Sequence, residues 1–285
     1  MAAVAAGYNA RMLTELIAVT GATGELGGRV ARRLAERGVR QCLIVRDASR
    51  APQLPGAELV QAPGGYIDRD GMTRALAGAH VLFLVPAHES PNRIEEHTTA
   101  VDAALDAGVK RIVYLSFVGA SADNTFTLGR HHWATEQHIR ASGARWTFVR
   151  MSLYMDFIPH FAGKDGVIRG PAGEGRVAAV LRDDLADAVV TVLTTDGHDE
   201  AVYEITGPSA FSLAEIAQLL GAHYVDETEQ EAYASRATYG APDWEVEGWV
   251  TSYLAIRNGE VETVSDDLRR LTGRDGTSLQ AFLAR

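Results

Sequence analysis

A short apolar run that breaks into three evenly spaced glycines constrains the fold of this chain more than any other feature. Residues 16–20 are apolar and rich in β-branched side chains, which is typical of a strand buried on both faces. From Glu25 onward, leucine or valine recurs every four residues among arginines and predicts an amphipathic helix that Gly38 ends. The sequence therefore predicts a strand, a glycine loop and a helix.

The glycine loop predicts a dinucleotide site. Its glycines are three residues apart, and such a spacing permits a tight turn, close approach of backbone N–H groups to a pyrophosphate, and close packing of helix on strand. The partial positive charge at the helix N-terminus faces the same anion. An ordinary strand–loop–helix connection is the alternative, but strand, spacing and helix agree. The predicted cofactor-binding residues of the loop are Gly21, Ala22, Thr23, Gly24, Glu25, Leu26 and Gly27.

The end of the next predicted strand indicates which dinucleotide is bound. Gln41–Val45 is followed by Arg46, with Arg50 one helical turn later. An NAD site usually places a carboxylate at this strand end for the ribose 2′-OH, whereas an NADP site accommodates the 2′-phosphate with an arginine. Asp47 comes one residue late and suits the N-cap of the following segment. A solvated surface arginine is the alternative, but the position favours NADP(H) over NAD(H).

Composition and charge exclude several classes of protein. The net charge of −10 disfavours a nucleic-acid surface, and no basic stripe is present. No apolar run approaches the roughly 18 residues of a membrane span and no secretory segment precedes the strand, so we expect a cytoplasmic protein without a membrane partner. The single cysteine, Cys42, excludes a disulfide framework. Residues 1–12 show no strong period and are predicted to be a flexible leader.

Strand and helix patterns alternate well beyond the glycine loop, which predicts an α/β fold of Rossmann type, a doubly wound parallel sheet. We predict residues 13–155 to form the NAD(P)-binding domain. Residues 156–285, where the pattern loosens, are predicted to form a smaller mixed lobe that is interleaved with the sheet and covers the substrate. Further strands are predicted at 58–61, 80–86, 110–117, 146–150 and 202–206, and further helices at 68–76, 93–107, 128–142, 182–194 and 212–220.

Several stretches also carry a family resemblance. VTGATGELGGRV, VRDASR, DAGVKRIVYLSFVGA, HHWATEQHIRASGARWTFVR and GPAGEGRVAAVLRDDLADA occur in this order. Together they resemble the NmrA-like branch of the atypical short-chain dehydrogenase/reductases, and most closely the NADPH-dependent quinone oxidoreductases of bacteria. The resemblance implies that residues 21–27 hold the pyrophosphate and Arg46 the 2′-phosphate. It also implies that the nicotinamide ribose lies between two segments, with Val85, Pro86, Ser116 and Phe117 beside it.

The chain departs from the family pattern at two places. Members often carry an acidic residue near the adenine, where this chain has Ala62 and Pro63. Many carry a lysine where this chain has Gln137, and the Tyr-x-x-x-Lys pair of typical short-chain dehydrogenases is absent. The contacts of the adenine and the source of a catalytic proton must therefore be sought in other residues.

The helix predicted at 128–142 carries the candidate catalytic residues. His132 and Glu136 are four residues apart and share a helix face, so the carboxylate could orient an imidazole that donates a proton or polarises a quinone oxygen. Ser116 at the end of the fifth strand could donate a hydrogen bond to the same oxygen, and His131 is a further candidate. Capping and packing are the alternative roles. A metal site at His131 and His132 is disfavoured because no ligand pattern supports it.

Three aromatic residues, Tyr154, Phe157 and Trp249, are predicted to form walls for a flat substrate, with core packing as the alternative. The resemblance implies an NAD(P)H-dependent oxidoreductase acting on a quinone or related aromatic carbonyl compound, as a monomer or homodimer. Two alternatives stay open. One is a ketoreductase or monooxygenase that tailors an aromatic polyketide, and the other is a non-catalytic sensor of the NADP redox state.

Overall fold

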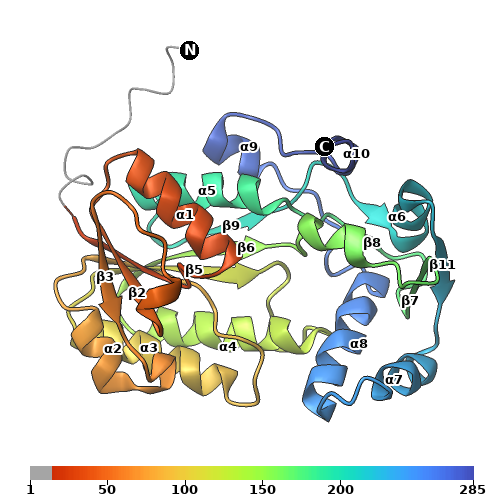
Figure 1. Cartoon of the computed structure of the whole chain (residues 1–285), viewed down its shortest axis with the longest axis horizontal. Coiled ribbons are helices and arrows are strands. Elements are labelled where there is room, and N and C mark those ends of the chain that lie inside the picture. The colour runs from red at the N-terminus through yellow and green to blue at the C-terminus, as the bar shows by residue number, and fades with distance from the viewer. Residues whose placement is uncertain (1–14) are drawn as a thin grey trace.

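Seven parallel strands form the central sheet of the computed structural model, which describes residues 15–285 (Figure 1). Their order is β3-β2-β1-β4-β5-β6-β9, and every neighbouring pair is parallel. The direction of winding reverses between β1 and β4, so the crevice beyond their carboxyl ends is the switch point where such sheets bind ligands. The strands are β1 (Ile17–Thr20), β2 (Gln41–Val45), β3 (Ala57–Gln61), β4 (Val81–Leu84), β5 (Arg111–Phe117), β6 (Arg145–Met151) and β9 (Ala201–Ile205).

Helices cover both faces of the sheet. One face carries α1 (Glu25–Glu36) and α5 (Arg182–Thr194), and the opposite face carries α2 (Arg69–Ala75), α3 (Arg93–Asp106) and α4 (Thr127–Ala141) (Figure 1). Because strand side chains alternate between faces, each strand supplies both cores. Ile17 and Val19 pack beneath α1 and α5, whereas Ala18 packs on the other side. The predicted doubly wound α/β fold is confirmed.

Most of the chain after residue 155 forms a smaller lobe at one end of the sheet (Figure 1). Its core joins the 3-10 helix Met155–His160 and the end of β5 to helices of the C-terminal part. The intervening α5 and β9 belong to the main sheet, so this region contributes to both parts. Its other elements are β7 (Val167–Gly170), β8 (Arg176–Val177), β10 (Phe211–Ser212), α6 (Leu213–Leu220), β11 (His223–Asp226), α7 (Glu229–Ala237), α8 (Asp243–Arg257), α9 (Asp267–Thr272) and α10 (Leu279–Leu283).

Most element predictions agree with the structure to within a few residues, but the strand predicted at 80–86 is shorter. β4 ends at Leu84, because the Val85 N–H donates to Thr20 Oγ1 and Pro86 has no N–H to donate. The predicted leader, residues 1–12, lies outside the described residues. Within residues 15–285, no helix combines the length and apolar character needed to cross a bilayer.

Candidate functional site

The turn between β1 and α1 is built so that only glycine fits at its closest approaches. Gly21 has φ +66°, and a Cβ on Gly27 would lie 2.3 Å from the carbonyl oxygen of Gly21. Gly24 is the N-cap of α1, and no side chain caps the helix there. The first N–H groups of α1 therefore stay available for an anion at its positive end. This cradle fits the pyrophosphate of a dinucleotide.

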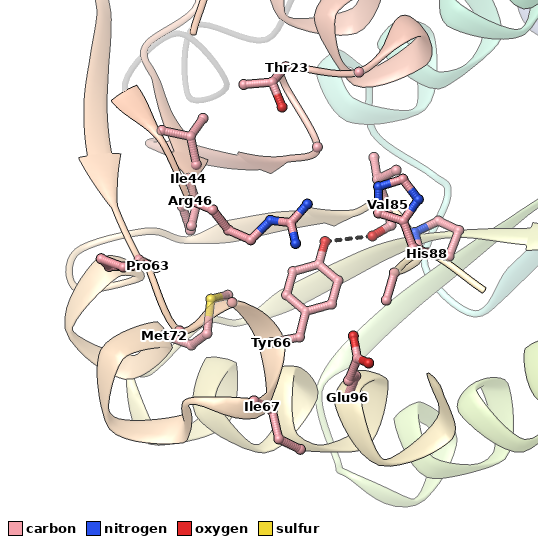
Figure 2. Close-up of a pocket in the computed structure, with 18 residues that line it drawn as sticks. Thr23, Ile44, Arg46, Pro63, Tyr66, Ile67, Met72, Val85, His88 and Glu96 are labelled. Atoms are coloured by element: carbon pink, nitrogen blue, oxygen red, sulfur yellow. Dashed lines mark hydrogen bonds between the residues drawn. The ribbon is translucent and has the colours of Figure 1, made fainter. Parts of the chain in front are cut away.

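A cavity of about 520 Å³ extends from this turn across the carboxyl ends of β1, β2, β3 and β4 (Figure 2). A pocket of this size is typical of a cofactor site. The predicted cofactor residues that line it are Gly21, Thr23, Gly24, Arg46, Val85 and Pro86. The predicted residues that do not line it are Ala22, Glu25, Leu26, Gly27, Ser116 and Phe117. The lining residues are Gly21, Thr23, Gly24, Ile44, Val45, Arg46, Ala62, Pro63, Gly64, Gly65, Tyr66, Ile67, Met72, Val85, Pro86, Ala87, His88 and Glu96.

Arg46 reaches into the cavity from the end of β2 (Figure 2). Its stem passes close to Gly65, where a Cβ would lie 3.5 Å from Arg46 Cδ. Within residues 15–285, no carboxylate forms an ion pair with Arg46. Asp47 is occupied elsewhere, because its side chain accepts the Ser49 N–H at 2.9 Å and caps the next 3-10 helix, as predicted. A cation without a carboxylate beside it suits a phosphate better than a ribose hydroxyl.

The part of the cavity between β2 and α2 is apolar. Ile44, Ala62, Pro63 and Met72 line it, and the cavity's one acidic lining residue, Glu96, lies on the other side of Tyr66 (Figure 2). An adenine ring here would be held by shape and apolar contact. Tyr66 separates this part from the segment that follows β4, and its hydroxyl donates to the Val85 carbonyl oxygen at 2.6 Å.

Ser116, at the end of β5, is buried beside Glu136, and the partly exposed Arg150 completes a polar group with them. The Ser116 hydroxyl donates to Glu136 Oε1 at 2.6 Å, and Arg150 of β6 donates to both oxygens of the same carboxylate at 2.9 and 2.7 Å. Ser116 and Glu136 are each 0% exposed. The structure thus brings two predicted catalytic residues together, and adds an arginine that the sequence did not suggest.

His132 has other partners. Its Nδ1 lies 2.8 Å from the Tyr114 hydroxyl, and its Nε2 lies 3.2 Å from Arg93 Nη2. An arginine only donates, so Nε2 accepts and the proton of the neutral ring resides on Nδ1. Burial, reinforced by Arg93, lowers the pKa of His132 well below its usual value. The predicted orientation of His132 by Glu136 is therefore wrong, because neighbouring elements supply a separate partner to each.

His131, the adjacent residue of α4, is partly buried and its Nδ1 has no partner in the described part of the chain. Burial and the nearby Arg93 lower the pKa of His131 to about 4. Among residues 15–285, no three potential metal ligands converge. The catalytic roles of Ser116, His131, His132 and Glu136 stay predictions.

Two of the three predicted aromatic walls lie together. Tyr154 and Phe157 form an edge-to-face pair with ring centroids 6.1 Å apart, and the Arg182 guanidinium lies 4.0 and 4.4 Å from their ring centroids. Phe157 is 51% exposed. Trp249 instead packs against the small core between α7 and α8, and its ring lies edge-to-face with the exposed Tyr239. Its predicted place beside the substrate stays a prediction.

Sequence reasoning missed the residues that support the segment after β4. Arg93 and His97 lie on α3 and contact Ala87, while Tyr66 contacts Val85. The helical spacing of Arg93 and His97 could have predicted that these two residues are buried together. Arg93 and His97 are four residues apart and in helical register with Ala100, Val101 and Ala104, so they share the face turned to the sheet.

Comparisons with known proteins agree with the binding of NAD(P)H. A protein family described as NAD(P)H-binding matches residues 21–196, which include the glycine turn, Arg46 and the crevice. The NAD(P)H azoreductase of Xenophilus azovorans is 30% identical over 276 residues, covering 94% of this chain and 96% of that protein.

Two solved structures are similar over nearly the whole chain. The NADPH-dependent quinone oxidoreductase of Escherichia coli, complexed with NADPH, has a TM-score of 0.85 and 31% identity over 94% of this chain and 98% of its own. The triphenylmethane reductase of Citrobacter sp., complexed with NADP(H), has a TM-score of 0.83 and 33% identity over 94% and 99%. The chain therefore belongs to the NAD(P)H-binding family, and these relatives are NAD(P)H-dependent oxidoreductases.

Proposed function

We propose that this protein uses NADPH to reduce a flat, conjugated, electron-poor acceptor such as a quinone. The bound cofactor supplies the hydride, and the protein orients it against the acceptor. One observation carries the proposal: neither Ser116 nor His132 has a proton free to give. The Ser116 hydroxyl is donated to Glu136, the His132 Nδ1 proton points to Tyr114, and His132 Nε2 accepts from Arg93.

This arrangement separates classes of acceptor by their need for an acid. Reduction of an isolated ketone places charge on one alkoxide oxygen, so a positioned acid contributes strongly to the rate. Reduction of a quinone spreads the charge over a conjugated ring, and the resulting anion can take its proton from water. Azo compounds and triphenylmethane dyes, named for two relatives, are also conjugated acceptors. Because Ser116 and His132 have no free proton to give, the site favours conjugated acceptors over isolated ketones.

The proposed cofactor preference is NADP(H) over NAD(H). Arg46 lies at the strand end where the ribose of the adenosine half would lie, and it has no carboxylate partner within residues 15–285. The N–H groups of the first turn of α1 would hold the pyrophosphate. We place the acceptor against Tyr154 and Phe157, because Phe157 is exposed and Arg182 fixes both rings.

NADPH oxidation measured across a panel of acceptors tests this function. The panel contains a benzoquinone, an azo dye, a triphenylmethane dye, an aromatic polyketide ketone and a simple aliphatic ketone. We expect turnover of the conjugated acceptors and little turnover of the aliphatic ketone. Aliphatic ketone reduction as fast as quinone reduction would contradict the proposal, since it requires an acid that these groups do not supply.

A non-catalytic sensor of the NADP redox state is the second candidate, and the same observation favours it. Polar groups that satisfy one another can hold a cofactor without catalysing a reaction. The panel separates the two functions when it is combined with cofactor titration. Tight NADPH binding with no turnover of any acceptor would favour the sensor.

A further inference from the structure

The segment Val85–Ala87, which follows β4 and lines the cofactor cavity, is held almost entirely by side chains. Pro86 has no N–H, so the segment has two N–H groups and three carbonyl oxygens. The Val85 N–H donates to Thr20 Oγ1 at 2.9 Å. The Tyr66 hydroxyl donates to the Val85 carbonyl oxygen at 2.6 Å (Figure 2). The strand ladder therefore does not set the path of this segment.

The other end of the segment is held by α3. The Ala87 N–H donates to His97 Nε2 at 2.9 Å, and Arg93 Nε donates to the Ala87 carbonyl oxygen at 3.1 Å. His97 and Arg93 are 0% and 3% exposed. Removing either partner would leave a partly buried backbone group of Ala87 without its partner and loosen this end of the segment.

A second layer of contacts fixes the proton on His97. The Thr135 hydroxyl donates to the His131 carbonyl oxygen at 2.9 Å, so its oxygen can only accept from His97 Nδ1, 2.8 Å away. The neutral ring then carries its proton on Nδ1 and presents a lone pair at Nε2 to Ala87. Burial, with Arg93 adding to it, lowers the pKa of His97 well below its usual value and keeps this form at neutral pH.

We infer that Tyr66, Arg93 and His97 are positioning residues that set the wall of the cofactor site through the segment Val85–Ala87. The inference rests on the proposed function, because it assumes that the cavity holds NADPH. Hydride transfer is sensitive to geometry, and a displacement of about 1 Å can lower a rate by about 10²-fold. All three side chains touch the segment. Arg93 and His97 do not line the cavity and act on the cofactor through the segment, whereas Tyr66 also lines the cavity itself.

Three variants test the role of His97. His97→Leu removes the acceptor for the Ala87 N–H, whereas His97→Gln can keep an acceptor towards Ala87 and a donor towards Thr135. His198→Leu is the matched control, because His198 also bonds through both ring nitrogens, to Thr195 and Tyr203, in a different part of the molecule. Each variant is measured for amide hydrogen exchange of residues 84–92, for NADPH affinity, and for single-turnover NADPH oxidation with a quinone.

We expect His97→Leu to speed exchange of the segment by about tenfold or more, since a local opening is then less costly. NADPH oxidation should slow by about 10–100-fold, and NADPH affinity should weaken by a smaller factor. His97→Gln should restore exchange and rate to within a few-fold of wild type. The control should change global stability without these local effects.

Segment exchange in His97→Leu equal to that in His198→Leu, or failure of His97→Gln to restore it, would overturn the inference. If His97→Leu does not fold, Tyr66→Phe replaces it, because that change removes only the hydroxyl that holds Val85. Amide exchange and NADPH affinity are both measured without any electron-accepting substrate. A wild-type protein that reduces nothing would therefore contradict the proposed function, while these two measurements would still decide the positioning role.

Discussion

Arg46 is the single residue with the clearest expected effect on the choice of cofactor. Its guanidinium lies in the cavity at the end of β2 (Figure 2). Arg46→Ala should weaken NADPH binding by about 1–3 kcal/mol, because a charged hydrogen bond to the 2′-phosphate is lost. NADH binding should hardly change. Calorimetric titration of both cofactors measures the difference, with Arg50→Ala as the neighbouring control, and an equal loss for NADH would remove Arg46 from the 2′-phosphate site.

His132 is expected to support the fold of the site without transferring a proton. Its two ring nitrogens are occupied by Tyr114 and Arg93. His132→Gln should therefore keep kcat for quinone reduction within about tenfold of wild type, and the pH dependence of kcat should be unchanged. A loss of about 10²–10⁴-fold, the usual scale of a missing general acid, would return His132 to the catalytic role predicted from the sequence.

At the scale of elements, α1, the helix proposed to bind the pyrophosphate, is tied to α5 by ion pairs. Arg33 of α1 donates to Asp183 and Asp187 at 2.9 and 2.7 Å, and Arg29 also contacts Asp183. These side chains are partly exposed, so solvent screens the pairs. α5 also carries Arg182, which holds Tyr154 and Phe157. The network therefore joins α1 to the proposed acceptor wall.

Arg33→Met tests this connection, because it keeps most of the aliphatic stem and removes the charge. We expect the free energy of unfolding to fall by about 0.5–1 kcal/mol, the range of a partly exposed network. The loss should shrink at high salt. Urea denaturation measures it, and Arg32→Met on the exposed side of the same helix is the control. An equal effect of both substitutions would show that the ion pairs add nothing specific.

For the whole molecule, the buried imidazoles predict sensitivity to acid. Burial lowers the pKa of His97 and of His132 well below the ordinary value near 6.5. Below pH 6.5 the unfolded chain binds protons that the folded protein does not accept, so the free energy of unfolding falls with pH. For these two groups the loss between pH 6.5 and 5.5 should be about 2 kcal/mol.

Denaturant unfolding at a series of pH values measures this dependence. His97→Gln should flatten the slope between pH 6.5 and 5.5, since one of the groups that contribute to it is then absent. Stability that does not change over this interval would show that the two imidazoles become protonated in the folded protein as readily as in the unfolded chain.

The sequence by itself determined the parts of this protein that depend on local pattern. The apolar run at 17–20, the glycines at 21, 24 and 27 and the helix that follows are contiguous, so the period and the spacing predict strand, turn and anion site together. Arg46 was found in the same way, because its place at a strand end is a local feature. Alternation of such units also predicted the parallel sheet.

Only the tertiary structure decided which polar groups meet. Helical spacing correctly places His132 and Glu136 on one face, but it does not say what the neighbouring elements bring to that face. Arg150 from β6 reaches Glu136, while Arg93 from α3 reaches His132 across 39 positions of sequence. A buried charge binds the best partner that packing presents to it, since an unpaired one is costly. That choice is made between elements and leaves no local pattern in the chain.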